Sequence, residues 1–388
     1  MAEKKIISLR KKRNILTAKK IFKIMRIPVV VLAVAAALFL SARLMGNVAV
    51  SNITDGIRQV KTVFTKSGGF PYSLDTFNFK KADAIGSGVI AVNNDSTVVL
   101  NSSADELFNM QIKPGSRVIT QNGRALIYGT ASNEVVLQGK TEKLGSVTED
   151  STVVAAALAE NGSFATSHAS EKHQSILRVY NSRFKNVFQW NCSQERIADI
   201  ALSQNGRNLA IAAVGAENAE IYTRIIVFNI GDTEPKADVK FSGTMFFDVV
   251  YTASGKIIAA GDNKTVVLNK KGETVDETVY AEDSILAVCS DDSGNTVVCY
   301  EEFGGAKTGI ARYSRSGKKT CLVAVEGIPD CVAAEGGRIA VASGNEIVVY
   351  SQNGKEVKRI ETENSIESVF IASGTVYAVD GGAIYKYS

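Results

Sequence analysis

The two histidines of the chain, His168 and His173, are the first residues to test for chemistry. They lie five positions apart, with Glu171 between them, in a stretch rich in polar residues. Imidazole and carboxylate groups can bind a zinc ion, but such sites normally add cysteines or further clustered carboxylates, which are missing here. The pattern therefore favours two solvent-exposed histidines in a loop, and we expect neither a bound metal ion nor a cofactor.

Two acidic pairs could provide carboxylate chemistry. The sequence DDSG at 291–294 resembles a calcium-binding or acid–base pair, yet it is also typical of a hairpin turn, which is the interpretation that we favour. Glu301 and Glu302 stand in a polar stretch that could contact a ligand, although such pairs are usually only solvated. The sequence contains no P-loop, no helical H-x-x-x-H and no G-x-S-x-G motif. We therefore predict that the protein is not an enzyme.

The cysteines do not indicate a disulfide framework. They are odd in number and contain no C-x-x-C pair: Cys192, Cys289, Cys299, Cys321 and Cys331. Cys289 and Cys299 fall on neighbouring predicted strands, but counting from the turn between them puts the two out of step. We expect mainly buried free thiols that act as small apolar residues.

A repeating set of short strands must position these residues. From about residue 74 the chain consists of alternating β-branched runs separated by turn residues. A turn glycine followed by an apolar strand recurs eight times at an average spacing of about 41 residues, at Gly88, Gly123, Gly162, Gly206, Gly255, Gly294, Gly337 and Gly374. This spacing is typical of four-stranded, WD40-like blades. The sequence predicts an all-β fold, an eight-bladed β-propeller spanning residues 74–388.

The last repeat ends at its third strand, so the fourth strand of blade eight must come from elsewhere. The segment 76–80, TFNFK, alternates as a strand does and lies just ahead of the first blade. We predict that it completes blade eight and closes the ring. A seven-bladed ring with one degenerate repeat, and an open arc, are the alternatives.

Three predicted turns between second and third strands are longer than the others, at 167–174, 215–220 and 301–307. In a propeller these turns share one face with the connections between blades. Extended loops on a rigid scaffold commonly carry function, although they can also be simply longer hairpins. The predicted binding residues on this face are His168, Glu171, His173, Glu217, Glu220, Glu301 and Glu302.

The N-terminal region predicts a membrane anchor. Ten lysines and arginines but only one acid precede residue 28, and an apolar run at 29–40 follows them. We predict a basic cytoplasmic tail at 1–27, a single transmembrane helix at 28–46 and a propeller outside the cell membrane. A cleavable signal peptide and a buried core helix are the alternatives. The remaining chain is mildly acidic, which argues against nucleic-acid binding.

Residues 47–73 are predicted to form a short juxtamembrane helix and a linker. Val50, Ile53, Ile57, Val60 and Phe64 recur at helical spacing. The apolar stripe could lie on the membrane, pack under the domain or pair with a second copy, so the oligomeric state stays open. The sequence SGGFP at 67–71 contains strong helix breakers and marks the domain boundary.

The chain resembles an uncharacterised family of single-pass, membrane-anchored β-propeller proteins from clostridial Firmicutes. The resemblance rests on the basic head and span, on GGFPYSLDTFN at 68–78, and on ALSQNGRNLAIAAVGAENAEIYTRIIVFN at 201–229. It implies location and fold, since the family has no assigned activity. Quinone-cofactor dehydrogenases and outer-membrane assembly propellers share the eight-bladed plan, but the adjacent cysteines and repeated tryptophan motif of those dehydrogenases are missing here.

These observations lead to one main hypothesis and two alternatives. We expect a membrane-tethered, extracytoplasmic propeller that acts as a non-catalytic binding or scaffold module for a protein or an envelope polymer. The first alternative is a propeller hydrolase or lyase of cell-wall glycan, with carboxylates converging near the central channel. The second, a sensor that signals through its cytoplasmic tail, has only 27 residues without a folded domain to work with.

Overall fold

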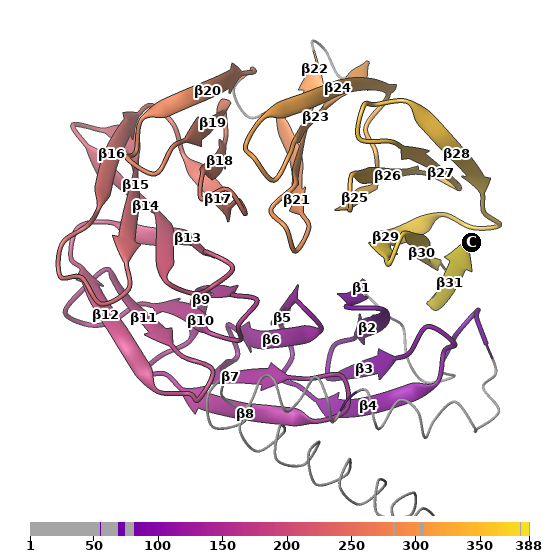
Figure 1. Ribbon diagram of the computed structural model, residues 1–388, viewed down its shortest axis with the longest axis horizontal. Coiled ribbons are helices and arrows are strands. Elements are labelled where there is room, and N and C mark those ends of the chain that lie inside the picture. Colours follow the sequence, from indigo (N-terminus) through magenta and orange to yellow (C-terminus); the bar gives the residue numbers. More distant parts are fainter. Residues whose placement is uncertain are drawn as a thin grey trace, which may run out of the picture. The chain divides into compact units, whose positions relative to one another are not determined.

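The computed structural model describes residues 55, 69–73, 81–281, 284–302, 306–380 and 382–387. In these residues thirty-one strands form eight antiparallel sheets arranged around a central axis (Figure 1). Seven sheets have four strands and the eighth has three. The predicted all-β, eight-bladed propeller is confirmed, and the seven-bladed ring and the open arc are wrong.

Successive strands form successive blades, from the innermost strand outward. Blades one and two contain β1 (Lys81–Ile85), β2 (Gly88–Val92), β3 (Ser96–Leu100), β4 (Glu106–Gln111), β5 (Ser116–Gln121), β6 (Arg124–Gly129), β7 (Ser132–Gln138) and β8 (Lys143–Thr148). Blades three and four contain β9 (Val153–Leu158), β10 (Phe164–His168), β11 (Ser175–Tyr180), β12 (Asn186–Cys192), β13 (Arg196–Leu202), β14 (Asn208–Glu217), β15 (Glu220–Asn229) and β16 (Ala237–Ser242).

The second half of the ring follows the same order. Blades five and six contain β17 (Phe246–Tyr251), β18 (Ile257–Gly261), β19 (Lys264–Leu268), β20 (Thr274–Val279), β21 (Ile285–Ser290), β22 (Thr296–Glu302), β23 (Lys307–Tyr313) and β24 (Lys319–Glu326). Blades seven and eight contain β25 (Cys331–Glu335), β26 (Arg338–Ser343), β27 (Glu346–Tyr350), β28 (Glu356–Glu361), β29 (Ile366–Ala372), β30 (Thr375–Asp380) and β31 (Ala383–Tyr387).

The hydrophobic core lies between neighbouring blades. The middle strands, such as β6 and β18, are buried along their whole length, because both of their faces contact a neighbouring blade. The outer strand β20 alternates exposed and half-buried residues, as a strand does when only one face is covered. One cluster joins Leu177 of blade three to Ile226 of blade four, and another joins Ile225 of blade four to Val266 of blade five. No blade buries its own apolar faces alone, so the ring is the stable unit.

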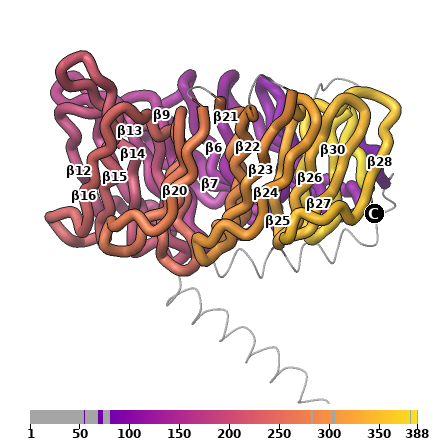
Figure 2. Tube along the Cα trace, turned by 90° about the horizontal axis from the view of Figure 1, so that it is seen from above, coloured from indigo at the N-terminus to yellow at the C-terminus, as the bar shows by residue number. Residues whose placement is uncertain are grey.

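The two faces of the ring differ in the loops that they carry. We call the face with the second-to-third turns and the blade-to-blade connections the long-loop face; 169–174 in blade three is one such turn. The opposite face, with first-to-second and third-to-fourth turns, is the short-turn face; 139–142 in blade two is an example. Figure 2 shows the ring edge-on, with the strands crossing from one face to the other.

Five third-to-fourth turns share one geometry, in blades one, three, five, six and seven. In each, the backbone N–H of the first residue donates to the carbonyl of the fifth, and the N–H of the fourth donates to the carbonyl of the first. The first residue is Asn or Ser, whose side chain also accepts a hydrogen bond from a backbone N–H group within the turn in all five turns. The fourth residue has positive φ, which explains the glycine at three of these positions.

Blade eight pairs with a residue that precedes blade one. Tyr72 N donates to Ile384 O at 2.9 Å and Ile384 N donates to Tyr72 O at 2.8 Å. Phe70 packs edge-on against Tyr377 of β30, with 5.4 Å between ring centroids. Tyr72, ahead of the first blade, therefore forms an isolated bridge to the last strand. The segment predicted to complete blade eight, 76–80, lies outside the described residues, so its role stays a prediction.

The predicted tail and span, residues 1–46, lie outside the described residues. Within the part of the chain that the structure describes, no helix has the length and apolar character needed to cross a membrane. From the predicted juxtamembrane helix only Asp55 is described, and it is helical and buried. Its carboxylate accepts hydrogen bonds from Thr141 Oγ1 at 2.5 Å and from Lys140 N at 3.3 Å. Asp55 therefore contacts a third-to-fourth turn of the short-turn face.

Candidate functional site

His168 is a buried strand residue. It is the last residue of β10 and has no exposed surface. The prediction of two exposed loop histidines is wrong for His168, because β10 continues to this position and pairs with β11 at Ile176. His173 does lie in the 169–174 turn, half-buried, with its Nδ1 3.1 Å from Ser193 Oγ, and Glu171 is exposed.

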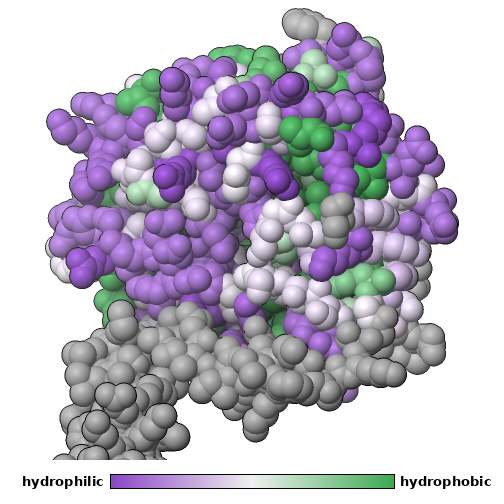
Figure 3. Space-filling model, turned by 45° about the vertical axis from the view of Figure 1, so that its right-hand side comes forward, coloured by the Kyte–Doolittle hydropathy of each residue, from purple (hydrophilic) through white to green (hydrophobic). Residues whose placement is uncertain are grey.

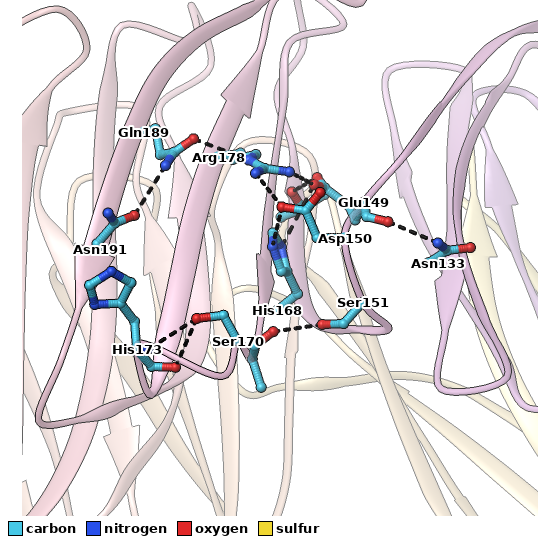
Figure 4. Close-up of polar contacts among 12 residues, drawn as sticks. Asn133, Glu149, Asp150, Ser151, His168, Ser170, His173, Arg178, Gln189 and Asn191 are labelled. Carbon is cyan, nitrogen blue, oxygen red and sulfur yellow. Dashed lines mark hydrogen bonds and ion pairs between the residues drawn. The ribbon is translucent and has the colours of Figure 1, made fainter.

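Two carboxylates that the sequence analysis missed flank the His168 ring (Figure 4). Nδ1 lies 3.7 Å from Glu149 Oε2 and Nε2 lies 3.8 Å from Asp150 Oδ2. Neither ring nitrogen has a hydrogen-bond partner among the described residues. Glu149 and Asp150 belong to the connection between β8 and β9, on the same face as the end of β10. In the sequence, the one indication of their role is that this acidic pair stands shortly before the apolar run of β9.

Arg178 on β11 neutralises both carboxylates. Its Nη1 donates to Glu149 Oε2 at 2.7 Å and its Nη2 donates to Asp150 Oδ2 at 2.5 Å. These bonds lower the pKa of Asp150, and burial lowers the pKa of His168. The cluster is therefore a carboxylate pair that binds an arginine, with a neutral imidazole between the acids. Among the described residues, no group of three or more His, Cys, Asp or Glu could hold a metal ion.

Blade four repeats this arrangement without the histidine. Glu195, in the connection before β13, accepts a bond from Arg224 Nη1 at 2.9 Å and from Tyr222 OH at 3.1 Å. Arg224 also pairs with Asp238. Like Arg178, it lies on the third strand of its blade. An acid in the connection that binds an arginine on the next blade is thus a structural device that fastens two blades, and only blade three adds a histidine.

The predicted loop at 215–220 is a continuous β-hairpin. Strands β14 and β15 pair from Asn208–Asn229 to Glu217–Glu220, and Asn218 and Ala219 form the tip with φ of 52° and 65°. Glu217 and Glu220 are exposed at the tip. Glu217 pairs with Lys240 on β16 at 2.5 Å, and this contact lowers the pKa of Glu217.

The third predicted loop lies in blade six, where Glu301 and Glu302 end strand β22 and are half-buried. Glu301 N donates to Ser284 O at 2.7 Å. Residues 303–305 lie outside the described part of the chain. The seven predicted binding residues therefore share one face but fall in three blades, and the structure does not bring them together in one site.

A cavity of about 1140 Å³ occupies the centre of the ring. Its wall includes three aspartates of innermost strands, Asp83, Asp199 and Asp248. Register shifts between Ile197 and Asp199, and between Phe246 and Asp248, re-aim two of them. Asp199 Oδ2 accepts a hydrogen bond from Val249 N at 2.8 Å. These acids, absent from the predicted site, come from separate blades and could be found only once the ring was closed.

Burial controls the charge of these acids. It raises the pKa of Asp248 to about 6. Burial, and then repulsion from Asp248, raises the pKa of Asp199 well above its ordinary value. The two carboxylates of neighbouring blades thus disfavour each other's ionisation.

The DDSG turn of blade six reaches across the cavity on the short-turn face. Asp291 Oδ1 accepts the N–H groups of Ser293 and Asn295 at 2.9 Å, which confirms the predicted turn. Asp292 Oδ2 accepts the N–H of Asn122 in blade two at 2.9 Å. Burial raises the pKa of Asp292 to about 6. The pair therefore shapes a turn and links opposite blades.

All five cysteines are free thiols, as predicted, but the expectation that most of them are buried is wrong: only Cys192 and Cys299 are buried, and the other three are half-buried. Cys289 pairs with Val297, and Cys299 pairs with Ala287, so the two thiols are out of register. Burial raises the pKa of Cys299 to about 12, which leaves it a poor nucleophile.

Comparisons with known proteins identify a family and a fold. Residues 72–386 match the family described as "Family of unknown function (DUF5711)". No curated protein matches the chain. Sqt1 of Saccharomyces cerevisiae is similar in structure, with a TM-score of 0.58 at 10% identity, covering 81% of this chain and 97% of Sqt1.

Two further solved structures agree. The C-terminal WD40 domain of Sif2 has a TM-score of 0.58 at 10% identity and covers 83% of this chain and 98% of that one. BamB from Moraxella catarrhalis has a TM-score of 0.52 at 12% identity and covers 81% and 98%. At such low identities these similarities show the propeller fold alone.

Proposed function

The chain belongs to the DUF5711 family, whose function is unknown, and from the geometry of its propeller we propose that it is a non-catalytic binding or scaffold module. In this proposal a single N-terminal span holds the propeller on the extracytoplasmic side of the cell membrane. The long-loop face then binds a protein or a cell-envelope polymer. The partner is expected to be basic, because the tip of the β14–β15 hairpin on this face presents the exposed acids Glu217 and Glu220.

The observation that carries the proposal is the β14–β15 hairpin. It presents Glu217 and Glu220 beside Ile221, which is 48% exposed. Met245, in the neighbouring connection, is 38% exposed, and Gly243 N ties this connection to Ile221 O at 2.8 Å. Acidic and apolar side chains are thus held together on a hydrogen-bonded ladder. A preformed surface of this kind loses little conformational freedom when it binds.

Asp55 is the described residue nearest in sequence to the predicted span, and it contacts the 139–142 turn of the short-turn face. The proposed binding surface lies on the opposite, long-loop face.

The test is quantitative affinity capture from membranes of cells that express the tagged full-length chain. We expect the variant Glu217→Lys/Glu220→Lys to recover its partner about tenfold less than the unsubstituted chain, since a tenfold loss corresponds to about 1.4 kcal/mol. Glu234→Lys/Glu273→Lys is the matched control, because it makes the same charge change at exposed turns of the short-turn face. Equal recovery by the two variants contradicts a binding role for the hairpin.

A second candidate function, cleavage of cell-wall glycan, draws on the central cavity. Glycoside hydrolysis uses one protonated carboxylic acid and one carboxylate, and the raised pKa values of Asp199 and Asp248 suit such a pair. If this function holds, full-length protein incubated with purified cell walls releases reducing ends, and Asp199→Asn lowers the release at least about 100-fold. Absence of release by the unsubstituted protein contradicts it.

A further inference from the structure

Third-to-fourth turns give the short-turn face a ring of basic side chains. In blades two to seven each of these turns contains at least one lysine or arginine: Lys140, Arg183, Lys185, Lys236, Lys270, Lys271, Arg315, Lys318 and Lys355. The same turns contain four acids, of which only Glu273 lies in blades five to seven. We call Lys270, Lys271, Arg315, Lys318 and Lys355 the basic sector.

The charges of the basic sector are not neutralised within the described part of the chain. All five side chains are exposed, and none of their charged groups has an ion pair or hydrogen bond with another described residue. Two lysines at the long-loop end of their strands differ, since Lys240 pairs with Glu217 and Lys307 pairs with Glu326. The basic sector is therefore a surface on which positive charge is left available.

Backbone geometry sets these charges in equivalent turns. The three turns of the basic sector, 269–273, 314–318 and 351–355, have the shared hydrogen-bond pattern described above. Turns of equal length on equivalent strands end at similar levels around the ring. The result is a row of ammonium and guanidinium groups along one side of a flat face.

A backbone hydrogen bond joins a turn of blade five to the Arg315 turn of blade six. Ser254 N donates to Arg315 O at 3.2 Å across the blade boundary. The Lys270 side chain crosses over Gly255, where a Cβ would lie 2.4 Å from Lys270 Cε. Gly255, which also has φ of +79°, thus lets the aliphatic stem of Lys270 pack over the neighbouring turn of the same blade, and the Lys270 side chain remains exposed.

We propose that the basic sector binds the anionic headgroups of a lipid bilayer. This role is separate from the binding role of the long-loop face, and it rests on the proposed function only for the membrane tether. Asp55, which lies fifteen residues after the apolar run at 29–40 in the sequence, contacts a turn of this same face. Each lysine near an anionic membrane surface adds to the electrostatic attraction between protein and membrane. This attraction falls off within a Debye length of the surface.

Surface chemistry favours a lipid surface over a soluble polyanion or an apolar partner. Lysines outnumber arginines four to one in the basic sector, and ammonium groups act as mobile point charges that suit a fluid array of headgroups. Figure 3 shows a surface that is mostly hydrophilic, with hydrophobic residues in small separate patches. The predicted attraction is therefore electrostatic.

The test is residue-resolved lysine labelling of the full-length chain reconstituted into vesicles. With an amine-reactive, membrane-impermeant reagent and mass spectrometry, we expect Lys270, Lys271, Lys318 and Lys355 to be labelled about fivefold more slowly in phosphatidylglycerol-rich vesicles than in phosphatidylcholine vesicles. High salt should remove the difference. Lys113 and Lys172, exposed on the long-loop face, serve as internal controls in the same molecules. Because the labelling rate is measured for each lysine separately, membrane binding by the basic tail is not counted as protection of the basic sector.

A charge-reversal variant gives an independent readout. Lys271→Glu/Lys318→Glu should remove the protection of Lys270 and Lys355, whereas Lys113→Glu/Lys172→Glu should leave it unchanged; unaltered thermal unfolding shows that both variants fold. Equal labelling in the two vesicle types overturns the proposal. Protection by added polyphosphate but not by anionic vesicles also overturns it and assigns the surface to a soluble polyanion. Neither result bears on capture of a partner by Glu217 and Glu220.

Discussion

Replacing Arg178 with alanine is expected to lower the free energy of unfolding by about 3–5 kcal/mol. The Glu149 side chain is fully buried and accepts hydrogen bonds from Arg178 Nη1 at 2.7 Å and from Thr166 Oγ1 at 2.5 Å. Removal of the guanidinium leaves a buried carboxylate without its counter-charge, which is one of the costliest single changes in a protein interior. Urea unfolding of the full-length chain at pH 8 provides the measurement.

Two variants separate this cause from a general loss of packing. Arg178→Ala/Glu149→Gln should recover much of the lost stability, because the remaining amide carries no charge. Lys240→Ala breaks the exposed pair with Glu217 and should change stability little. A double variant as unstable as Arg178→Ala alone would show that the charge of Glu149 is not the reason.

Asp248→Asn is expected to stabilise the protein at pH 8, by at most about 3 kcal/mol. Burial raises the pKa of Asp248 to about 6, above its ordinary value of 3.8. The folded state therefore holds this proton more tightly than the unfolded state does. Stability is higher below pH 4 and is lost as the pH rises from about 4 to about 6, so the neutral asparagine avoids a cost that aspartate carries at pH 8.

The pH profile tests the sign of this effect. The gain from Asp248→Asn, measured by urea unfolding, should be largest above pH 7 and should disappear near pH 4. Glu234→Gln, at an exposed turn, is the matched control and should show no such dependence. Because Asp199 lies beside Asp248 and its pKa is raised by it, Asp248→Asn should also lower the pKa of Asp199. A gain that is constant from pH 4 to pH 8 would contradict the assignment.

The repeat made the fold predictable from the sequence. Seven of the eight motif glycines have positive φ, so a residue-type signal marks the same backbone geometry in blade after blade: Gly123, Gly162, Gly206, Gly255, Gly294, Gly337 and Gly374. Gly88 is the exception. In blade one Gly86 takes the positive φ, and a Cβ at Gly88 would lie 2.4 Å from Leu100 O. The glycine is required in both cases, but for different reasons.

The candidate site was less predictable because it depends on contacts between blades. The sequence around His168 is polar and predicts a loop, whereas its burial depends on Glu149 in the β8–β9 connection and Arg178 on β11. The β14–β15 hairpin also read as a loop, because GAENAE at 215–220 contains turn-forming residues. Its pairing works because Gly215 leaves room for the Tyr222 ring, which would lie 2.6 Å from a Cβ there.

The pairing of Tyr72 with Ile384 sets an order of events during biosynthesis. A growing chain delivers Tyr72 first and Ile384 more than three hundred residues later, so the seam of the ring is sealed only when the whole domain has been made. Blades can stack on one another as they emerge, but β31 and the residues around Tyr72 keep open strand edges until they meet. Open edges can pair with other chains. Formation of the Tyr72–Ile384 pairing is thus also the step that covers the last open strand edges, through which the chain could aggregate.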